Sequence, residues 1–392
     1  MKWKTVWGIS VGIMNVTESG KLSRPIPDLR TDWESVVQSW ASSSLRDEYK
    51  VMAVDALKYL RQQFGEEWVR LAREQMHPLL SLFGNIVPWT AGFISDQAEM
   101  LKKLSSIDGF DILLQKLRDS DGFREDISLM DAAYRFGTFS RVPSLHHTIS
   151  GREKDILTEL DGQECVIEVT NSNSPIETRE RNTWEAIVIP LEMAWREITA
   201  QGTIHKPLSK NRAKEANEIV RNAIACARRE GRPKHVSMER AFEFTIYPKE
   251  KFPDITYKLE GLPFAADEKR SAIEIDHLYD TIRKKSDQLV AENVGGVVVY
   301  SDPDYFIKKS ETNGFAEKLV DDLEEALYDR DRLSFFVLIL IDIGAGEEKM
   351  ECEDFLYRER TKHRMLHERI LVIRNKYAAK PMDISTLRPL IA

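Results

Sequence analysis

Residues 155–170 read DILTELDGQECVIEVT, and this stretch decides the fold. Runs with apolar residues at alternating positions flank Asp161-Gly162, a dipeptide that strongly favours a two-residue hairpin turn. With that turn, Leu160 pairs with Gln163, and counting outward along both strands places Asp155 directly opposite Glu168. Directly opposed residues of an antiparallel pair have β-carbons about 4.5–5.5 Å apart and point to the same face. The sequence therefore predicts two carboxylates side by side on a β-hairpin.

Two carboxylates this close repel one another unless a cation or a shared proton neutralises them. Carboxylate oxygens suit Mg²⁺ or Mn²⁺, and such an ion would polarise a phosphodiester and activate water. Thr170 shares the face of Glu168, because side chains alternate along a strand. We therefore expect a metal site with Asp155 and Glu168 as ligands. The alternative is a polar hairpin face that simply meets solvent.

The segments around the hairpin predict an α/β fold with a mixed central sheet flanked by helices. A helix is expected over 123–136, where apolar residues recur at intervals of four, three and four, and Asp131 lies beside that buried face. Further strands are expected at 242–247, 296–300, 335–343 and 369–374, and a long helix at about 273–292. The strands at 296–300 and 335–343 are nearly continuously apolar, which is typical of a sheet covered on both faces.

The region before the hairpin has a helical pattern from residue 32 to about residue 117. It begins with Thr31 and Glu34 at the spacing of a capping box. We therefore expect a mainly helical N-terminal region over 1–120 and an α/β domain over 121–392, with a basic helical insertion at about 175–240.

The insertion carries most of the local positive charge. Residues 206–240 contain ten lysines and arginines against four glutamates, in a chain whose net charge is -8. One interpretation is a solvated helix followed by a loop. The other is a surface that follows nucleic-acid phosphates, with Arg228, Arg229 and Arg232 as the binding residues.

The order of these features resembles the PD-(D/E)XK superfamily, whose restriction-endonuclease-like core runs helix, three strands, helix, strand. The resemblance rests on Asp131 in LMDAA, Asp155 in KDI and Glu168 in VIEVT. It implies a nuclease that uses Mg²⁺ or Mn²⁺ to hydrolyse DNA or RNA. Asp155 and Glu168 would be catalytic metal ligands, and Asp131 an accessory metal-binding carboxylate.

Two positions depart from the pattern of this superfamily. Lys154 stands where a proline is usual, and Thr170 stands where the motif has its lysine. A threonine hydroxyl cannot replace a fixed cation that orients water and stabilises developing charge. Some members of the superfamily supply the lysine from the following helix, and here Lys285 or Lys284 would do so if that helix packs against the hairpin. Gln288 lies one turn beyond.

Composition bounds the other possibilities. A chain of 392 residues with 42% hydrophobic content is long enough for two or three domains. Its three cysteines are far apart and lack metal-ligand spacing, so neither a disulfide framework nor a structural zinc site is expected, and a reducing, cytoplasmic location follows. The apolar run at 333–343 is too short to span a bilayer and reads as a strand, so no membrane partner is expected. The N-terminus lacks the cleavage site of a signal peptide.

Other catalytic motifs are weak or absent. There is no Walker loop, no GxSxG and no GxGxxG. His363 and His367 are four residues apart but lack the glutamate position of a zinc protease, so they are interpreted as surface histidines. His146 and His147 lie between the helix and the hairpin and are candidates for substrate contact.

Three functions remain open at this stage. The first is a metal-dependent nuclease acting on DNA or RNA. The second is a protein that keeps the nuclease fold without turnover and serves as a nucleic-acid-binding or scaffold subunit, with oligomer formation possible. The third is a regulatory protein whose helical N-terminal region is the working part.

Overall fold

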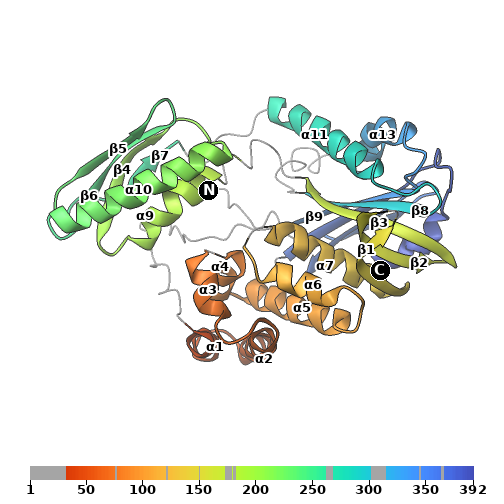
Figure 1. The fold of residues 1–392 in the computed structure, drawn as a ribbon, viewed down its shortest axis with the longest axis horizontal. Coiled ribbons are helices and arrows are strands. Elements are labelled where there is room, and N and C mark those ends of the chain that lie inside the picture. Colours follow the sequence, from red (N-terminus) through yellow and green to blue (C-terminus); the bar gives the residue numbers. More distant parts are fainter. Residues whose placement is uncertain are drawn as a thin grey trace.

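The computed structural model describes residues 32–75, 77–120, 122–149, 151–172, 179, 182–261, 268–301, 315–343, 346–362 and 366–392. Within them the chain is a mixed α/β protein with an eight-stranded sheet, a separate four-stranded sheet and a helical N-terminal region (Figure 1). The mixed α/β class and the helical N-terminal region predicted from the sequence are thereby confirmed. No helix in these ranges is long and apolar enough to cross a membrane.

The N-terminal region consists of short amphipathic helices. They are α1 (Trp33–Ala41), α2 (Asp47–Phe64), α3 (Trp68–Glu74), α4 (Pro78–Gly84), α5 (Pro88–Leu104) and α6 (Phe110–Leu117). The side chain of Asp32 caps α1 by accepting a hydrogen bond from Ser35 N. The cap is therefore Asp32, and Thr31, expected in that role, lies outside the described residues.

The large sheet has the order β1-β2-β3-β8-β9-β12-β11-β10. Its strands are β1 (Arg141–Ile149), β2 (Arg152–Leu160), β3 (Gln163–Ser172), β8 (Val294–Ser301), β9 (Phe335–Ile343), β10 (Glu348–Glu351), β11 (Phe355–Lys362) and β12 (Leu366–Arg374). Strands β3, β8 and β9 run parallel to one another, and the other neighbours are antiparallel. Parallel neighbours require a crossover connection, which α11 (Glu268–Ser286) and α13 (Phe315–Tyr328) provide.

The hairpin that joins β2 and β3 has the predicted register. Leu160 pairs with Gln163, and Ile156 pairs with Ile167. Asp161 has φ 50° and Gly162 has φ 76°, so both turn residues are in the left-handed region that a type I′ turn requires. The register extended by one residue sets Asp155 beside Glu168.

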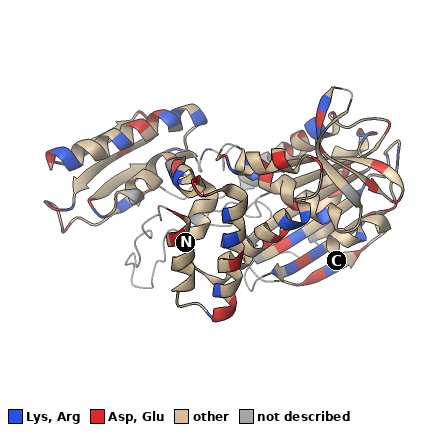
Figure 2. Ribbon diagram, turned by 60° about the horizontal axis from the view of Figure 1, so that its bottom comes forward, with Lys and Arg blue, Asp and Glu red and all other residues tan. Residues whose placement is uncertain are grey.

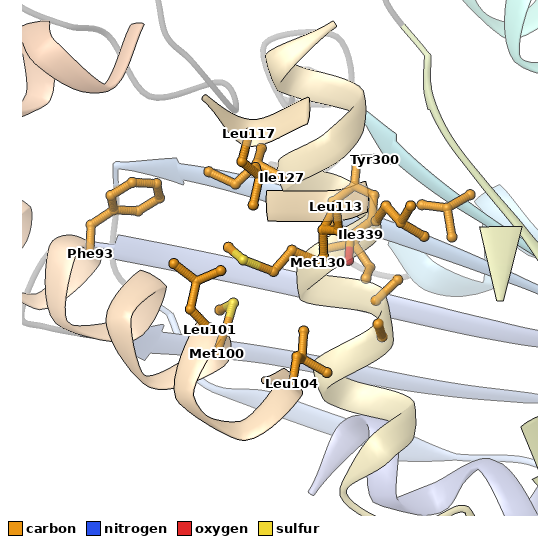
Figure 3. Packing of buried hydrophobic residues seen from close by; sticks show 14 of the residues in the cluster. Phe93, Met100, Leu101, Leu104, Leu113, Leu117, Ile127, Met130, Tyr300 and Ile339 are labelled. Atoms are coloured by element: carbon orange, nitrogen blue, oxygen red, sulfur yellow. The ribbon is translucent and has the colours of Figure 1, made fainter. Parts of the chain in front are cut away.

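Two hydrophobic cores cover the two faces of this sheet. On one face, α5, α6 and α7 (Phe123–Gly137) pack Leu104, Leu113 and Met130 against residues such as Tyr300 and Ile339 (Figure 3). Ile167 and Val169 point to this face. On the other face, α11 and α13 cover Val166, Val297 and Val299. Neighbouring residues of β3 therefore belong to different cores, as the period of two requires.

The segment between β3 and α11 forms a small unit with its own core. It contains η1 (Trp184–Val188), α9 (Ile189–Met193), β4 (Ile198–Ile204), α10 (Lys210–Glu230), β5 (Lys234–Met238), β6 (Phe242–Pro248) and β7 (Lys258–Glu260). Its strands form the sheet β5-β6-β4-β7, against which α10 packs Ala216, Val220 and Ile224. The expected helical insertion is thus an α+β unit, because strands follow the basic helix where a loop was expected. The chain ends in the 3₁₀ helix η3 (Ile384–Ile391).

Candidate functional site

Asp155 and Glu168 share one lysine. Lys285 Nζ lies 3.3 Å from Asp155 Oδ2 and 3.3 Å from Glu168 Oε2. The side chains of Asp155 and Lys285 are 25% and 21% exposed, whereas that of Glu168 is 2% exposed. The cluster therefore has a buried carboxylate at its base and an accessible carboxylate and ammonium at its edge.

The position of Lys285 follows from the apolar face of α11. Leu278 and Ile282 are buried against β3 and β8, and Lys285 continues the same helical face three residues later. Lys284 is exposed. The sequence offered Lys284 or Lys285 as the cation if the helix that carries them packs against the hairpin. That helix is α11, it does pack there, and its orientation brings Lys285 to the pair.

A second ammonium reaches Glu168 from the hairpin itself. The side chain of Lys154 is 1% exposed, and its Nζ lies 3.5 Å from Glu168 Oε1 and donates to the backbone carbonyl of Gln288. Sequence reasoning noted Lys154 only as a departure from a family motif. Strict alternation along β2 would send Lys154 to the face opposite Asp155, so the only signal was its place next to Asp155 in the chain.

The electrostatics of Glu168 balance burial against these cations. Burial raises the pKa of Glu168, and repulsion from Asp155 raises it further, while Lys285 and Lys154 lower it without cancelling the rise. Asp155 is fixed differently, because its Oδ2 accepts a hydrogen bond of 2.7 Å from Val169 N. Within the described part of the chain, the buried Glu168 Oε1 accepts no hydrogen bond. An oxygen in that state is suited to a further cation or water.

Thr170 lies where the hairpin register predicted. It is half-buried and pairs with Val299 of the parallel strand β8. By alternation it shares the face of Glu168, so its short hydroxyl occupies the strand position next to the pair. The cation of the cluster thus comes from α11 and β2 and not from this strand position.

Asp131 is not brought to the pair. It lies on α7, on the opposite face of the sheet, where Asp131 Oδ2 is 2.6 Å from Arg135 Nε and accepts a hydrogen bond of 2.6 Å from the Tyr300 hydroxyl. Arg135 also contacts Glu368, and Glu368 Oε2 lies 2.8 Å from Arg360 Nε. Asp131, Arg135 and Glu368 therefore belong to one buried ion network. Among the described residues, no three histidine, cysteine or acidic side chains form a group that could hold a metal. The expectation that Asp131 completes the metal site does not fit this geometry.

A cavity of about 400 Å³ opens beside this ion network, lined in part by Asp131, Arg135, Arg360 and Lys362. It lies on the α7 side of the sheet and does not include the carboxylate pair. Each cation that lines it is already bound to Glu368 or Asp131. We therefore take the pair, and not this cavity, as the candidate site.

Another acidic residue of α7, Asp126, interacts electrostatically with Asp155. Burial raises the pKa of Asp126 to about 6; the nearby Lys116 lowers it, and the charges of Glu125 and Asp155 raise it. Asp126 lies in the first turn of α7, five residues before Asp131. Sequence reasoning missed Asp126, because an acidic residue in the first turn of a helix is ordinarily explained by the helix dipole.

The arginines expected to bind nucleic acid lie on the insertion. Arg228 Nε is 2.7 Å from Glu197, and Arg229 contacts Glu230 at 3.6 Å. Arg232 is exposed, one residue beyond Gly231, the C-cap of α10. The structure therefore places these arginines together at one end of α10.

The histidines are distributed differently from expectation. His363 lies outside the described residues, while His367 is 2% exposed on β12 and contacts Glu359 at 2.6 Å. The interpretation of His367 as a surface histidine is wrong, because its side chain is buried on β12, an inner strand of the sheet. His146 Nδ1 lies 2.6 Å from Glu153 Oε1, and His147 pairs with Lys154 across β1 and β2.

Comparison of the chain with family models, with curated proteins and with solved structures gave no match. The function is therefore argued from the geometry of the site.

Proposed function

We propose that the chain is a metal-dependent nuclease with a restriction-endonuclease-like core. The observation that carries this proposal is the cluster of Asp155, Glu168 and Lys285, which unites two carboxylates of a hairpin with a lysine of the following helix. These residue types suit metal-assisted phosphodiester hydrolysis, because they supply oxygen ligands for a divalent ion and a fixed cation beside them.

The connectivity supports the same proposal. The elements α7, β1, β2, β3, α11 and β8 follow one another in the order helix, three strands, helix, strand, interrupted by the insertion before α11. Asp155 lies on the second of these strands and Glu168 on the third, as the superfamily resemblance requires. Strand β8 is parallel to β3, so α11 crosses over the face that carries the pair.

Asp155 and Glu168 would hold Mg²⁺ or Mn²⁺. Two carboxylates are enough for these ions, which keep several waters and bind substrate phosphates directly. The buried Glu168 Oε1, which accepts no hydrogen bond from the described residues, fits such a ligand. A bound ion would supply charge stabilisation and an activated water at the scissile phosphate.

The residues of the chain itself divide the remaining work. Val169 N–H fixes the orientation of Asp155, and Lys154 holds Glu168 from inside the fold. Lys285, at the exposed edge, would orient the attacking water and stabilise negative charge that develops on the phosphate. Thr170 carries no charge, so Lys285 takes the role that the motif lysine would have.

Cleavage of labelled single-stranded and double-stranded DNA and RNA with Mg²⁺ or Mn²⁺ tests the proposal. We expect the wild type to cleave at least one substrate, and Asp155→Asn, Glu168→Gln and Lys285→Ala each to lower the rate more than tenfold, on the order of 1.4 kcal/mol. Lys284→Ala is the matched control, because Lys284 is exposed and adjacent in the chain. Absence of cleavage of all four substrates would contradict the proposal.

One observation favours a second function, a nucleic-acid-binding or scaffold protein without turnover. The charges of Asp155 and Glu168 are already balanced by Lys154 and Lys285, so the cluster is stable without an added cation. If this function holds, Mg²⁺ should leave the melting temperature unchanged. A ligand that binds only the folded state must raise it. A rise that Asp155→Asn/Glu168→Gln abolishes would favour the nuclease.

A further inference from the structure

One end of the insertion concentrates positive charge. Three segments, 195–197, 228–234 and 247–252, contain seven lysines and arginines and only three glutamates, in a chain of net charge -8. Figure 2 shows lysines and arginines on α10 and on the strands of the insertion. The excess is local and lies far along the chain from the carboxylate pair.

Backbone contacts bring these three segments together. Ile198 pairs with Pro248, and Lys249 N donates to the carbonyl of Glu197, so the start of β4 lies at the end of β6. The contact between Arg228 and Glu197 adds the last turn of α10 to the same end. A side chain placed on Gly231 would meet Lys251 Nζ at 2.6 Å, which places Lys251 at the C-cap of α10.

Aromatic rings lie among these cations. Lys249 Nζ lies 4.9 Å from the ring centre of Trp195, and the Arg196 guanidinium lies 5.9 Å from it. Tyr247 and Phe252 form an edge-to-face pair with centres 5.7 Å apart. All three residues are only partly buried, so each has some surface open to solvent. Burial lowers the pKa of Lys249, so its ammonium is partly desolvated at the ring.

The pairing of the charges shows which cations are available. Arg229 and Lys234 both contact Glu230, and Arg228 contacts Glu197. Within the described part of the chain, Arg232, Lys249 and Lys251 contact no carboxylate. Basic residues in the last turn of a helix also stabilise the helix dipole, which accounts for Arg228 and Arg229. The same effect covers Lys251, whose ammonium lies at the C-cap of α10, but it does not account for Lys249, whose ammonium lies over the Trp195 ring.

We infer that this end of the insertion binds single-stranded nucleic acid. Arg232, Lys249 and Lys251 contact the phosphates, and a base stacks on Trp195. Cations that follow a backbone, interleaved with accessible aromatic rings, are the features with which proteins bind single strands without reading sequence. In duplex DNA the base faces are stacked on one another and cannot stack on Trp195. A duplex would therefore contact only the lysines and the arginine, through its phosphates. The inference names single strands as the substrate class of the proposed nuclease. It rests on that proposed function for the assumption that the bound polymer is a nucleic acid.

Fluorescence anisotropy of labelled 20-nucleotide DNA, RNA and duplex DNA, measured in EDTA with the full chain, tests the inference. We expect single strands to bind more tightly than the duplex, and Trp195→Ala to weaken single-strand binding roughly tenfold while changing duplex binding little. The triple variant Arg232→Gln/Lys249→Gln/Lys251→Gln should weaken both and reduce the slope of log affinity against log salt.

The matched control removes the same charge from the other end of the insertion. Lys206, Lys210 and Lys214 are exposed near the start of α10, whose 21 residues separate the two ends by about 30 Å. Their conversion to glutamine should leave the salt slope unchanged. Equal loss from both triples, or Trp195→Ala with unchanged single-strand affinity, would overturn the inference.

The proposed nuclease can fail separately. Because EDTA removes divalent ions, binding is measured without cleavage. A chain that binds through Trp195 but never cleaves would keep this inference and reject catalysis.

Discussion

Lys154 provides the sharpest test of how the candidate site is held together. Its side chain is 1% exposed and contacts Glu168, whose side chain is 2% exposed. Lys154→Met keeps the aliphatic stem but removes the ammonium, so of the two described lysines that contact Glu168 only Lys285 remains as a counter-ion. Loss of one partner from a buried ion pair costs about 3–5 kcal/mol, because the other charge stays buried. We expect a loss of unfolding free energy in that range.

The assay is urea denaturation followed by far-ultraviolet circular dichroism. Lys284→Met, at an exposed position, should change the free energy by less than about 0.5 kcal/mol. Lys154→Met/Glu168→Leu replaces both charges with apolar groups and should be more stable than Lys154→Met alone, with a coupling of at least about 1 kcal/mol. If Lys154→Met costs less than about 1 kcal/mol, or if the double variant is no more stable than the single one, Lys154 does not hold Glu168.

Three further predictions concern catalysis, metal binding and pH. Thr170→Lys should lower cleavage if Lys285 already supplies the cation, because a second ammonium crowds the pair, whereas a gain in cleavage would show that the site lacks one. Because the pKa of Glu168 is raised, stabilisation by Mg²⁺ should weaken on acidification at a higher pH than for an ordinary carboxylate, and a calorimetric titration of melting temperature against pH checks this. Burial lowers the pKa of His77 from 6.5 to about 4, and its Nδ1 accepts a hydrogen bond from Leu79 N that a proton would break. Its contribution, about 3 kcal/mol, is therefore present above pH 6.5 and lost as the pH falls toward 4, and His77→Gln, which does not titrate, should remove that part of the acid sensitivity in denaturation curves.

The hairpin and its carboxylate pair could be predicted because every signal was local. Asp161-Gly162 defines the turn, and the turn defines the register of both strands. The sequence predicted that either Lys284 or Lys285 would supply the cation, but it could not say which. Which of the two lysines reaches the pair depends on the face of the helix that packs against the sheet. Leu278 and Ile282 define that face in the folded chain.

Asp131 and Lys154 show where local signals end. Asp131 lies on the correct helix, but α7 covers the face of the sheet opposite the pair, and no pattern in the sequence says which face a helix covers. Lys154 reaches Glu168 although alternation along β2 predicts the other face. Both depend on contacts between segments far apart in the chain.

The strand expected at 242–247 is β6 of the small sheet, but the other strands of that sheet were missed, for a different reason. Strand β5 has only Val236 and Met238 as buried residues, and β4 contains Gly202, which weakens the pattern of a strand. The positive charge of α10 favoured a solvent-exposed helix over a packed α+β unit. Its buried face, Ala216 and Val220 among others, is built from small residues that carry little hydrophobic signal.

The place of the insertion in the chain has a consequence for the order of folding. Strand β3 ends at Ser172, and its hydrogen-bonded neighbour β8 begins only at Val294, so the whole insertion and α11 must be looped out before these strands can meet. Each doubling of such a loop adds about 0.6 kcal/mol of closure entropy. A segment with its own core that folds first shortens the effective loop, so early collapse of the insertion would accelerate the pairing that sets Glu168 beneath α11.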